Sequence, residues 1–212
     1  FGLAAAELRG LIDRAEFAIS TEETRYYLNG IYFHATDAEG TKILRAVATD
    51  GHRLARVEAP LPDGAENMPG VIVPRKTIGE LRKLIDETGE AVDIALSDTK
   101  IRFGFGKAVL TSKLIDGTFP DYERVIPSGN DKTLDIECKG FADAVDRVSA
   151  ISIEKSRAVK VVLSGNTLTL SASSPEHGTA SEELEINYDA EDIEIGFNSR
   201  YLLDIAKQVK GD

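Results

Sequence analysis

The sequence predicts an α+β fold, in which a few amphipathic helices pack against antiparallel β-sheets. Strand-like segments rich in Val, Ile, Thr, Tyr and Phe follow one another through short turns that contain Gly, Asp or Asn. Strands joined by such short turns pair antiparallel, because a parallel pair needs a long crossover connection. No glycine-rich loop leads from a strand into a helix, so the sequence does not support a nucleotide-binding fold of alternating strands and helices.

The chain also repeats itself. Asp13 and Asp146, each followed by Arg, occupy matching frames of two helical segments. The apolar residues around them correspond as well; they are Leu8, Ile12 and Ala15 in one segment and Phe141, Val145 and Val148 in the other. The repeat predicts two related units, 1–125 and 131–212, joined by a linker in which Pro and Gly interrupt regular structure.

In the first unit, helical spacing, turn residues and β-rich runs predict each element in order. An apolar stripe predicts a helix over Leu3–Ile19, and Pro74 favours the start of a second helix, Lys76–Ile85. The expected strands, separated by Gly- and Asp-containing turns, are Tyr26–His34, Lys42–Ala48, Arg53–Val57, Val71–Val73, Ala91–Leu96, Lys100–Phe105 and Lys107–Ser112.

The second unit is expected to repeat this alternation of helices and strands. The expected helices are Lys139–Ile151 and Ser199–Lys210. The expected strands are Leu134–Glu137, Ala158–Leu163, Thr167–Ala172, Ser181–Tyr188 and Asp192–Phe197. The Ser164-Gly165-Asn166 turn closes a hairpin between two of them.

The repeat is incomplete at both ends. The strand expected at Leu134–Glu137 has no counterpart before Ala4, so the opening strand of the first unit is expected to be truncated. The strands that close the first unit have no counterpart after Lys210, so the second unit is expected to be truncated at its C-terminal end. These differences favour a fragment over the alternative of an asymmetric two-domain protein.

The composition excludes several classes of protein. In 212 residues there are one Cys and three His, which excludes a disulfide framework and disfavours a metal site or a metal cofactor. No apolar run approaches the roughly 20 residues that span a bilayer, so we expect no membrane partner. No cofactor is expected. A hydrophobic fraction of 42% is enough for a core, and the reduced cysteine fits a cytoplasmic protein.

The charge distribution suggests a surface for nucleic acid in a protein whose net charge is −11. Acidic residues concentrate in connecting stretches, whereas the helices carry a moderate basic excess. Arg75 and Arg82, like Arg200 and Lys207, have i, i+7 spacing and share a helical face. Solvated helix faces with mixed ion pairs are the alternative. The recurrence of the basic pair favours a long polyanion as partner, with contacts from Arg14, Arg75, Lys76, Arg82, Arg147, Arg200 and Lys207.

Two other functions remain open from the residues alone. His52, in the Asp50-Gly51-His52 turn, suggests the acid–base group of a monomeric α+β enzyme, although no nucleophile motif accompanies it and no catalytic residue is expected. An adaptor that binds partner peptides without DNA is the other possibility. Apolar residues next to turns and in the linker favour peptide docking; they are Leu28, Leu54, Val125 and Tyr201, with Pro120 and Arg124 nearby.

Several segments together resemble the family of bacterial sliding clamps, the beta subunits of the replicative DNA polymerase III holoenzyme. The segments are Arg25–Gly30, Ala48–Leu54, Val73–Lys76, Thr111–Leu114, Phe119–Tyr122 and Ile195–Asn198. The resemblance covers essentially the whole chain in order. It implies tandem DNA-clamp modules, each with two helices on the inner face of antiparallel sheets, and it identifies 1–125 as the middle module and 131–212 as most of the third.

The resemblance also implies a function and its residues. A clamp is a non-catalytic processivity subunit of a transferase holoenzyme, and its head-to-tail homodimer encircles double-stranded DNA without sequence preference. Its implied partners are the polymerase catalytic subunit, the clamp loader and other proteins with clamp-binding motifs. The residues that match the peptide pocket are Leu28, Thr49, Gly51, His52, Arg53, Leu54, Pro120, Arg124, Val125, Asn198 and Tyr201. Tyr26 and Tyr27, next to Arg25, match a loop that touches DNA, although this chain has Glu22 where the family often has Gln.

Overall fold

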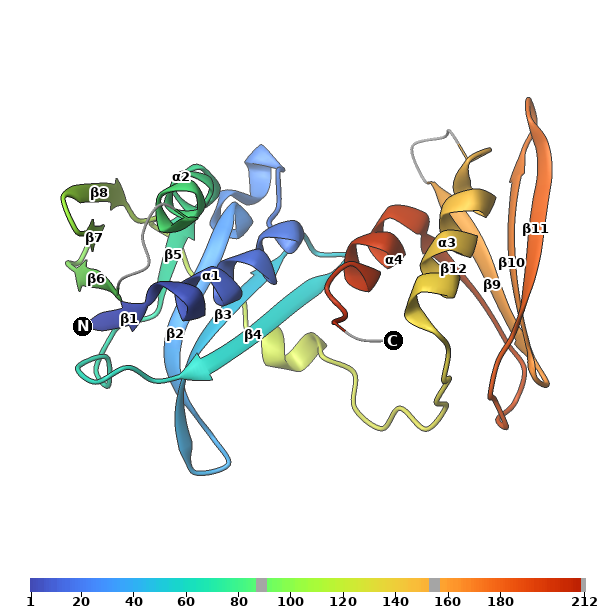
Figure 1. Cartoon of the computed structure of the whole chain (residues 1–212), viewed down its shortest axis with the longest axis horizontal. Coiled ribbons are helices and arrows are strands. Elements are labelled where there is room, and N and C mark those ends of the chain that lie inside the picture. The colour runs from blue at the N-terminus through green and yellow to red at the C-terminus, as the bar shows by residue number, and fades with distance from the viewer. Residues whose placement is uncertain (87–90, 153–156, 211–212) are drawn as a thin grey trace. The chain divides into compact units, whose positions relative to one another are not determined.

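The structure is a computed structural model that describes residues 1–86, 91–152 and 157–210 (Figure 1). The chain divides into two compact units, Phe1–Val125 and Ile126–Asp212. Each unit combines helices with sheets in which all strand pairs are antiparallel, so the prediction of an α+β fold is confirmed.

The first unit contains two four-stranded sheets. One has the order β1-β6-β7-β8, formed by Gly2–Ala4, Ala91–Leu96, Lys100–Phe105 and Ala108–Lys113. The other has the order β4-β3-β2-β5, formed by Leu54–Pro60, Thr41–Thr49, Gly30–Ala38 and Val71–Pro74. Short 3₁₀ helices connect these elements at Glu16–Ala18 (η1), Glu23–Leu28 (η2) and Tyr122–Val125 (η3).

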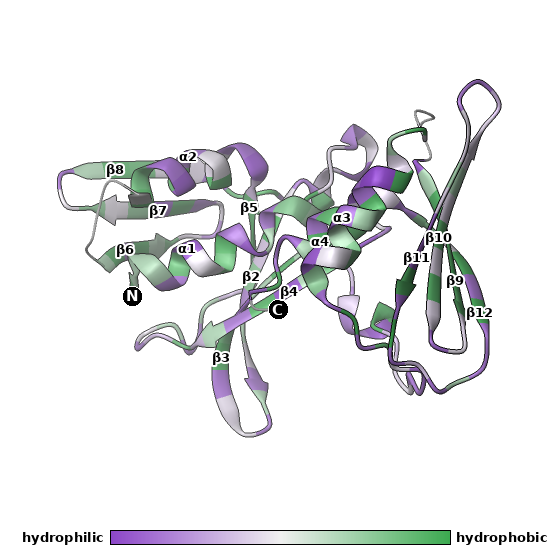
Figure 2. Cartoon of the chain, turned by 45° about the vertical axis from the view of Figure 1, so that its right-hand side comes forward, coloured by the Kyte–Doolittle hydropathy of each residue, from purple (hydrophilic) through white to green (hydrophobic). Residues whose placement is uncertain are grey.

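Helices α1 (Ala5–Asp13) and α2 (Arg75–Asp86) of the first unit lie side by side (Figure 1). Each helix buries one apolar stripe, and the two stripes share a core with both sheets. Leu11 and Ile12 of α1 and Ile78 and Leu81 of α2 are fully buried in this core. Figure 2 shows the corresponding alternation of hydrophobic and hydrophilic residues along the ribbon.

The second unit has one four-stranded sheet with the order β11-β10-β9-β12. Its strands are Gly178–Glu185, Thr167–Ser174, Ala158–Ser164 and Ile193–Asn198. Helices α3 (Cys138–Ser149) and α4 (Ser199–Ala206) pack against each other and contact the sheet. Each of the two helices begins at a side-chain cap: Glu137 accepts a hydrogen bond from the Lys139 backbone N–H, and Asn198 from that of Arg200.

The expected second helix of the first unit and most strands are confirmed, but three expected segments differ. The predicted helix Leu3–Ile19 is α-helical only over Ala5–Asp13, after which i→i+3 hydrogen bonds tighten the chain into η1. The aromatic run before Leu28 belongs to η2, so its strand begins later, at Gly30. The last helix ends at Ala206 and does not reach Lys210.

The expected opening strands are wrong in both units. Leu134–Glu137 is not a strand; it forms only an isolated bridge, in which the Asp135 and Asn187 backbones exchange hydrogen bonds of 3.4 Å. Conversely, a strand does precede the first helix, because Gly2–Ala4 pairs with β6. Among the described residues, no helix has the length and apolar character that a membrane span requires.

Candidate functional site

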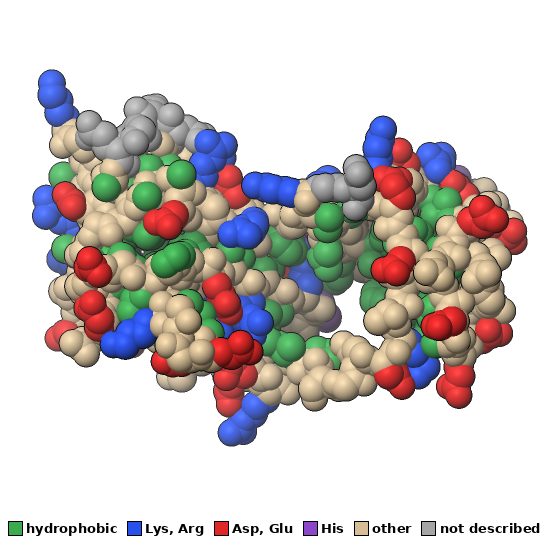
Figure 3. All heavy atoms as spheres, turned by 60° about the horizontal axis from the view of Figure 1, so that its bottom comes forward, with side chains coloured by type: hydrophobic (Ala, Val, Ile, Leu, Met, Phe, Trp, Pro, Cys, Tyr) green, Lys and Arg blue, Asp and Glu red, His purple; other side chains and the backbone are tan. Residues whose placement is uncertain are grey.

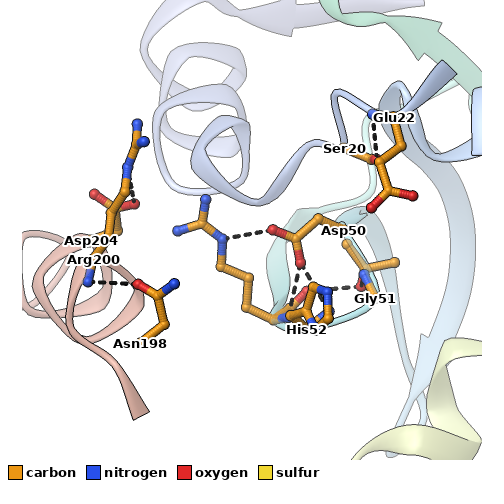
Figure 4. Close-up of polar contacts among 10 residues, drawn as sticks. Ser20, Glu22, Asp50, Gly51, His52, Asn198, Arg200 and Asp204 are labelled. Carbon is orange, nitrogen blue, oxygen red and sulfur yellow. Dashed lines mark hydrogen bonds and ion pairs between the residues drawn. The ribbon is translucent and has the colours of Figure 1, made fainter. Parts of the chain in front are cut away.

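The turn after β3 is shaped by Asp50. Its Oδ1 accepts hydrogen bonds from the backbone N–H groups of His52 (2.9 Å) and Arg53 (3.0 Å), which fixes a tight turn (Figure 4). Thr49 closes the same turn, since its hydroxyl donates to the Arg53 carbonyl and accepts from the Gly51 N–H. The turn fixes the backbone at His52, which is exposed and lies two residues before Leu54.

Gly51 is required in this turn for two reasons. Its φ of +88° lies in the left-handed region that L side chains rarely adopt. A Cβ atom there would also collide with the guanidinium of Arg25. Arg25 in turn forms an ion pair of 2.7 Å with Glu22, and this hydrogen bond raises the pKa of the Arg25 guanidinium. Arg25, predicted to contact DNA, thus lies against the turn that carries Gly51.

The Arg53 side chain packs against η1 of its own unit. Its guanidinium lies 5.2 Å from the centroid of the Phe17 ring, which is a cation–π geometry, and its Nε forms an ion pair of 3.1 Å with Asp50. The Arg53 side chain is only 12% exposed. Its contacts are those of a residue that fixes the turn against η1.

An apolar cluster lies beneath these turns, and we call it the pocket floor. Its members are the buried Leu28, Val47, Ile72, Phe119 and Tyr122, together with Leu54, which packs against them. Leu28, Leu54 and Phe119 come from three segments far apart in the sequence, so the fold unites residues that the sequence could place only near turns. A cavity of about 590 Å³ adjoins the floor and is lined in part by Tyr32, Ile72 and Phe119.

The segment that contains η3 forms a rim next to the floor. Pro120 and Arg124 are exposed, and Arg124 pairs with Asp121 at 2.7 Å within the same turn. Val125 is 69% exposed, so its apolar side chain faces solvent. An exposed apolar rim above an apolar floor is a surface that an apolar peptide side chain can cover.

A buried polar network behind η3 was missed by the sequence analysis. Arg45, 5% exposed, donates from Nε to Glu58 (2.9 Å) and from Nη1 to the Tyr122 hydroxyl (2.8 Å) and Glu123 (2.7 Å). His34 Nε2 lies 3.0 Å from the same hydroxyl. The one available signal was the position of Arg45 inside an otherwise apolar strand.

The remaining candidates for the pocket, Asn198 and Tyr201, belong to the second unit. Asn198 caps α4, as its side-chain oxygen accepts a hydrogen bond of 3.0 Å from the Arg200 backbone (Figure 4). Tyr201 follows in the first turn of the helix and is partly buried. The structure therefore gives Asn198 a local role at the start of α4.

The basic residues predicted to contact DNA have acidic neighbours. Arg82 of α2 pairs with Asp13 of α1, and Arg147 of α3 pairs with Glu182 of β11. In α4, Asp204 lies 3.9 Å from both Arg200 and Lys207, whereas Arg14 donates to the Gly10 carbonyl. Figure 3 shows the same mixture of acidic and basic side chains on the visible face. A polyanion would have to compete with these carboxylates.

Arg75 and Lys76 differ from that pattern. Both are exposed at the start of α2, and neither makes an ion pair within the part of the chain that the structure describes. Tyr26, also predicted to contact DNA, is 53% exposed, and its ring lies edge-on to Tyr27 at 5.7 Å. In residues 1–86, 91–152 and 157–210, no cluster of His, Cys, Asp and Glu has the arrangement of a metal site.

The comparisons with known proteins agree over the whole chain. Residues 2–121 match the central domain, and residues 123–212 the C-terminal domain, of the DNA polymerase III beta subunit. The chain belongs to the DNA polymerase III beta subunit family. Over 97% of this chain it is 58% identical to the beta sliding clamp of Caulobacter vibrioides. Over 99% of this chain it is 42% identical to the beta sliding clamp of Vibrio cholerae.

Solved structures from this family match the fold closely. The sliding clamp of Bartonella birtlesii, solved bound to griselimycin, covers all of this chain with a TM-score of 0.97 and 55% identity. The clamp of Pseudomonas aeruginosa covers 99% of it with a TM-score of 0.89 and 41% identity. The chain spans about half of these relatives, 55% of the Caulobacter protein and 57% of the Bartonella chain.

We predict that Gly51→Ala destabilises the first unit by about 1–3 kcal/mol, chiefly because Ala must adopt the strained positive φ, whereas the flexible end of Arg25 can move away from the new Cβ atom. Urea unfolding measures the change. Gly79→Ala in α2 is the control within the same unit, since a Cβ atom at Gly79 meets nothing within 4 Å. Equal stability of the two variants would show that the turn relaxes without cost.

Proposed function

We propose that this chain is part of a processivity clamp of the bacterial replicative DNA polymerase. In this proposal it supplies the middle module, 1–125, and most of the third module, 131–212, of a cytoplasmic, non-catalytic subunit. Two such subunits pair head to tail and encircle double-stranded DNA without reading its sequence. The polymerase catalytic subunit, the clamp loader and other proteins with clamp-binding motifs dock on the pocket floor and its rim.

The observation that carries the proposal is the pocket floor in a chain of the beta subunit family. Leu28, Leu54 and Phe119 converge from separate segments, and the exposed Val125 lies on the adjoining rim. A surface of this kind gains free energy when an apolar side chain displaces water from it. Asn198 and Tyr201 of the third module are also proposed as contacts of the peptide. Family membership favours the clamp over an enzyme centred on His52.

The charges suit a ring that slides. Sliding requires phosphate attraction that is weak and does not depend on sequence. Ion pairs such as Arg82–Asp13 and Arg147–Glu182 reduce the positive charge available to phosphates, and the exposed Arg75 and Lys76 keep theirs. Retention on DNA would then come from ring closure, which raises the effective concentration of the tethered polymerase. Binding of peptides without any DNA contact would instead favour the adaptor.

We predict that Leu54→Asp and Val125→Asp each weaken the binding of a polymerase-derived clamp-binding peptide at least about tenfold, because a carboxylate placed in an apolar contact loses its hydration. Fluorescence anisotropy measures the affinity. Val109→Asp is the control, since Val109 is exposed at 56% on the other sheet of the same unit. Unchanged binding by the first two variants would place the peptide elsewhere.

We predict that linear duplex DNA binds this chain weakly, with an affinity that falls steeply as salt rises. Replacing Arg75 and Lys76 together with Ala should reduce the slope of log affinity against log salt by about 2. The control replaces Lys107 and Lys113, which are exposed near the two ends of β8. An equal change in the control, or tight binding to one particular sequence, would contradict the proposed role of α2.

A further inference from the structure

The strongest unassigned feature of the molecule is the network around Tyr122, which we call the Tyr122 network. It comprises His34 of β2, Arg45 of β3, Glu58 of β4, and Tyr122 and Glu123 of η3. Arg45 is buried in a strand whose neighbours are apolar, so its charge needs several partners. These partners include two residues of η3, which links the rim to the sheet.

The hydrogen-bond chemistry of the network determines the protonation of His34. A guanidinium can only donate, so the Tyr122 oxygen accepts from Arg45 at 2.8 Å. The single hydroxyl proton of Tyr122 then needs an acceptor, and His34 Nε2 lies 3.0 Å away. Nε2 can accept only if it carries no proton. The arrangement in which every partner is satisfied thus assigns the proton of the neutral ring to Nδ1, which faces the Ala35 carbonyl at 3.4 Å.

Aromatic stacking fixes the rings in this geometry. Tyr32 stacks on His34 with ring centroids 4.8 Å apart, and it stacks on Phe119 at the same distance with an interplanar angle of 9°. Phe119 also belongs to the pocket floor. The ring of His34 is thereby coupled to the floor through Tyr32 and to the rim through Tyr122.

The rim has little else to hold it. In the described part of the chain, the η3 backbone makes no hydrogen bond to a strand. The ion pair of Arg124 with Asp121 stays within the turn itself. Side chains of the Tyr122 network and the buried ring of Tyr122 are therefore the ties between η3 and the sheet.

We propose that His34 and Arg45 are positioning residues for the peptide surface. They hold Tyr122, and through it the rim residues Pro120, Arg124 and Val125, in the arrangement that receives a peptide. Protonation of His34 releases that arrangement. The inference rests on the proposed function and names the residues that regulate the same surface. Neither residue touches the peptide.

The direction of the pH dependence follows from the surroundings of His34. Burial, the largest cause, lowers the pKa of His34 below its usual 6.5, and the nearby charge of Arg45 lowers it further. The Ala35 carbonyl and the carboxylate of Glu123 act in the opposite direction. Four other charged or titratable groups lie around this site. Glu58 pairs with Arg45, and Tyr32 stacks on the ring of His34. Tyr122 contacts His34, and Arg56 lies near Tyr122.

His34 is therefore neutral at pH 7, and its proton is bound more weakly in the folded chain than in the unfolded one. Well above pH 6.5 the ring of the folded chain carries no such proton, so the arrangement is fully present. It is lost as the pH falls through the lowered pKa of His34 in the folded chain. The protonated ring would direct a second donor at the Tyr122 oxygen and would place a positive charge beside Arg45.

The test measures the affinity of a histidine-free clamp-binding peptide between pH 8 and pH 5 by fluorescence anisotropy. The unmodified chain should lose affinity as the pH falls, by roughly three- to tenfold once His34 is fully protonated, the effect expected for one ordinary hydrogen bond. His34→Gln loses the ring that stacks on Tyr32, so its own affinity at pH 8 is the reference; that affinity should stay the same at pH 5, because the Gln carbonyl accepts the same hydrogen bond and does not titrate. Tyr122→Phe should bind weakly at both pH values.

The matched control is His177→Gln, which removes a histidine from the turn between β10 and β11 and should leave the pH dependence unchanged. A pH dependence of His34→Gln equal to that of the unmodified chain would overturn the proposal.

A nitrogen-15 NMR titration of His34 tests the same proposal without a peptide. It should show the Nδ1–H tautomer above pH 7, and Tyr122→Phe should raise the pKa of His34, because the donor to Nε2 is removed. The Nε2–H tautomer would overturn the inference. If the unmodified chain bound no peptide at pH 8, the proposed function would be contradicted. The tautomer measured by NMR would still show whether Tyr122 donates to His34 as inferred here.

Discussion

The burial of the Arg45 charge is the constraint on which, in our proposal, the peptide surface depends. A buried guanidinium needs acceptors for its N–H groups, and here Glu58, Tyr122 and Glu123 accept from Nε and Nη1. Two of these partners lie in η3, so the same requirement that stabilises the strand also fixes the rim of the pocket floor. A short segment with few backbone ties thus acquires a defined position from a charge in the sheet behind it.

The helices follow a different rule, in which basic side chains are exposed but balanced. Arg82 and Arg147 each face a carboxylate, and Asp204 lies between two basic residues of α4. Exposed ion pairs of this kind add little stability, because water and salt screen them. Their effect on a passing polyanion is larger, since a phosphate that contacts one of these paired residues must displace its carboxylate. We propose that this balance keeps contact with DNA weak enough for sliding.

The sequence predicted the fold well where the signal was local. Pro74 and the apolar stripe after it correctly indicated the start of α2, and alternating strands with Gly turns indicated the hairpins. The strand predicted over Leu134–Glu137 was wrong. Its alternation of apolar and polar residues resembles that of a strand, but a strand also needs a paired neighbour, and here only Asn187 forms a single bridge. The strand predicted to begin at Tyr26 was wrong for a similar reason: the aromatic residues before Leu28 resemble a strand but lie in η2.

The candidate site was predictable only in part. Leu28 and Leu54 stood out beside turns, and the fold unites them with Phe119 in the pocket floor. The Tyr122 network could not be read from the sequence, because Tyr122 lies 77 residues from Arg45 and 88 from His34. Pairing over such separations is set by tertiary packing, and no local pattern reports it.

Chemical-shift mapping by NMR tests the central claim most directly, since it asks where a clamp-binding peptide contacts the chain. We expect perturbed amide signals around Leu28, in the turn Thr49–Leu54 and in η3, with unperturbed signals in the hairpin of β10 and β11. Perturbations centred on that hairpin, with the signals of η3 unchanged, would contradict the claim that the floor and its rim receive the peptide.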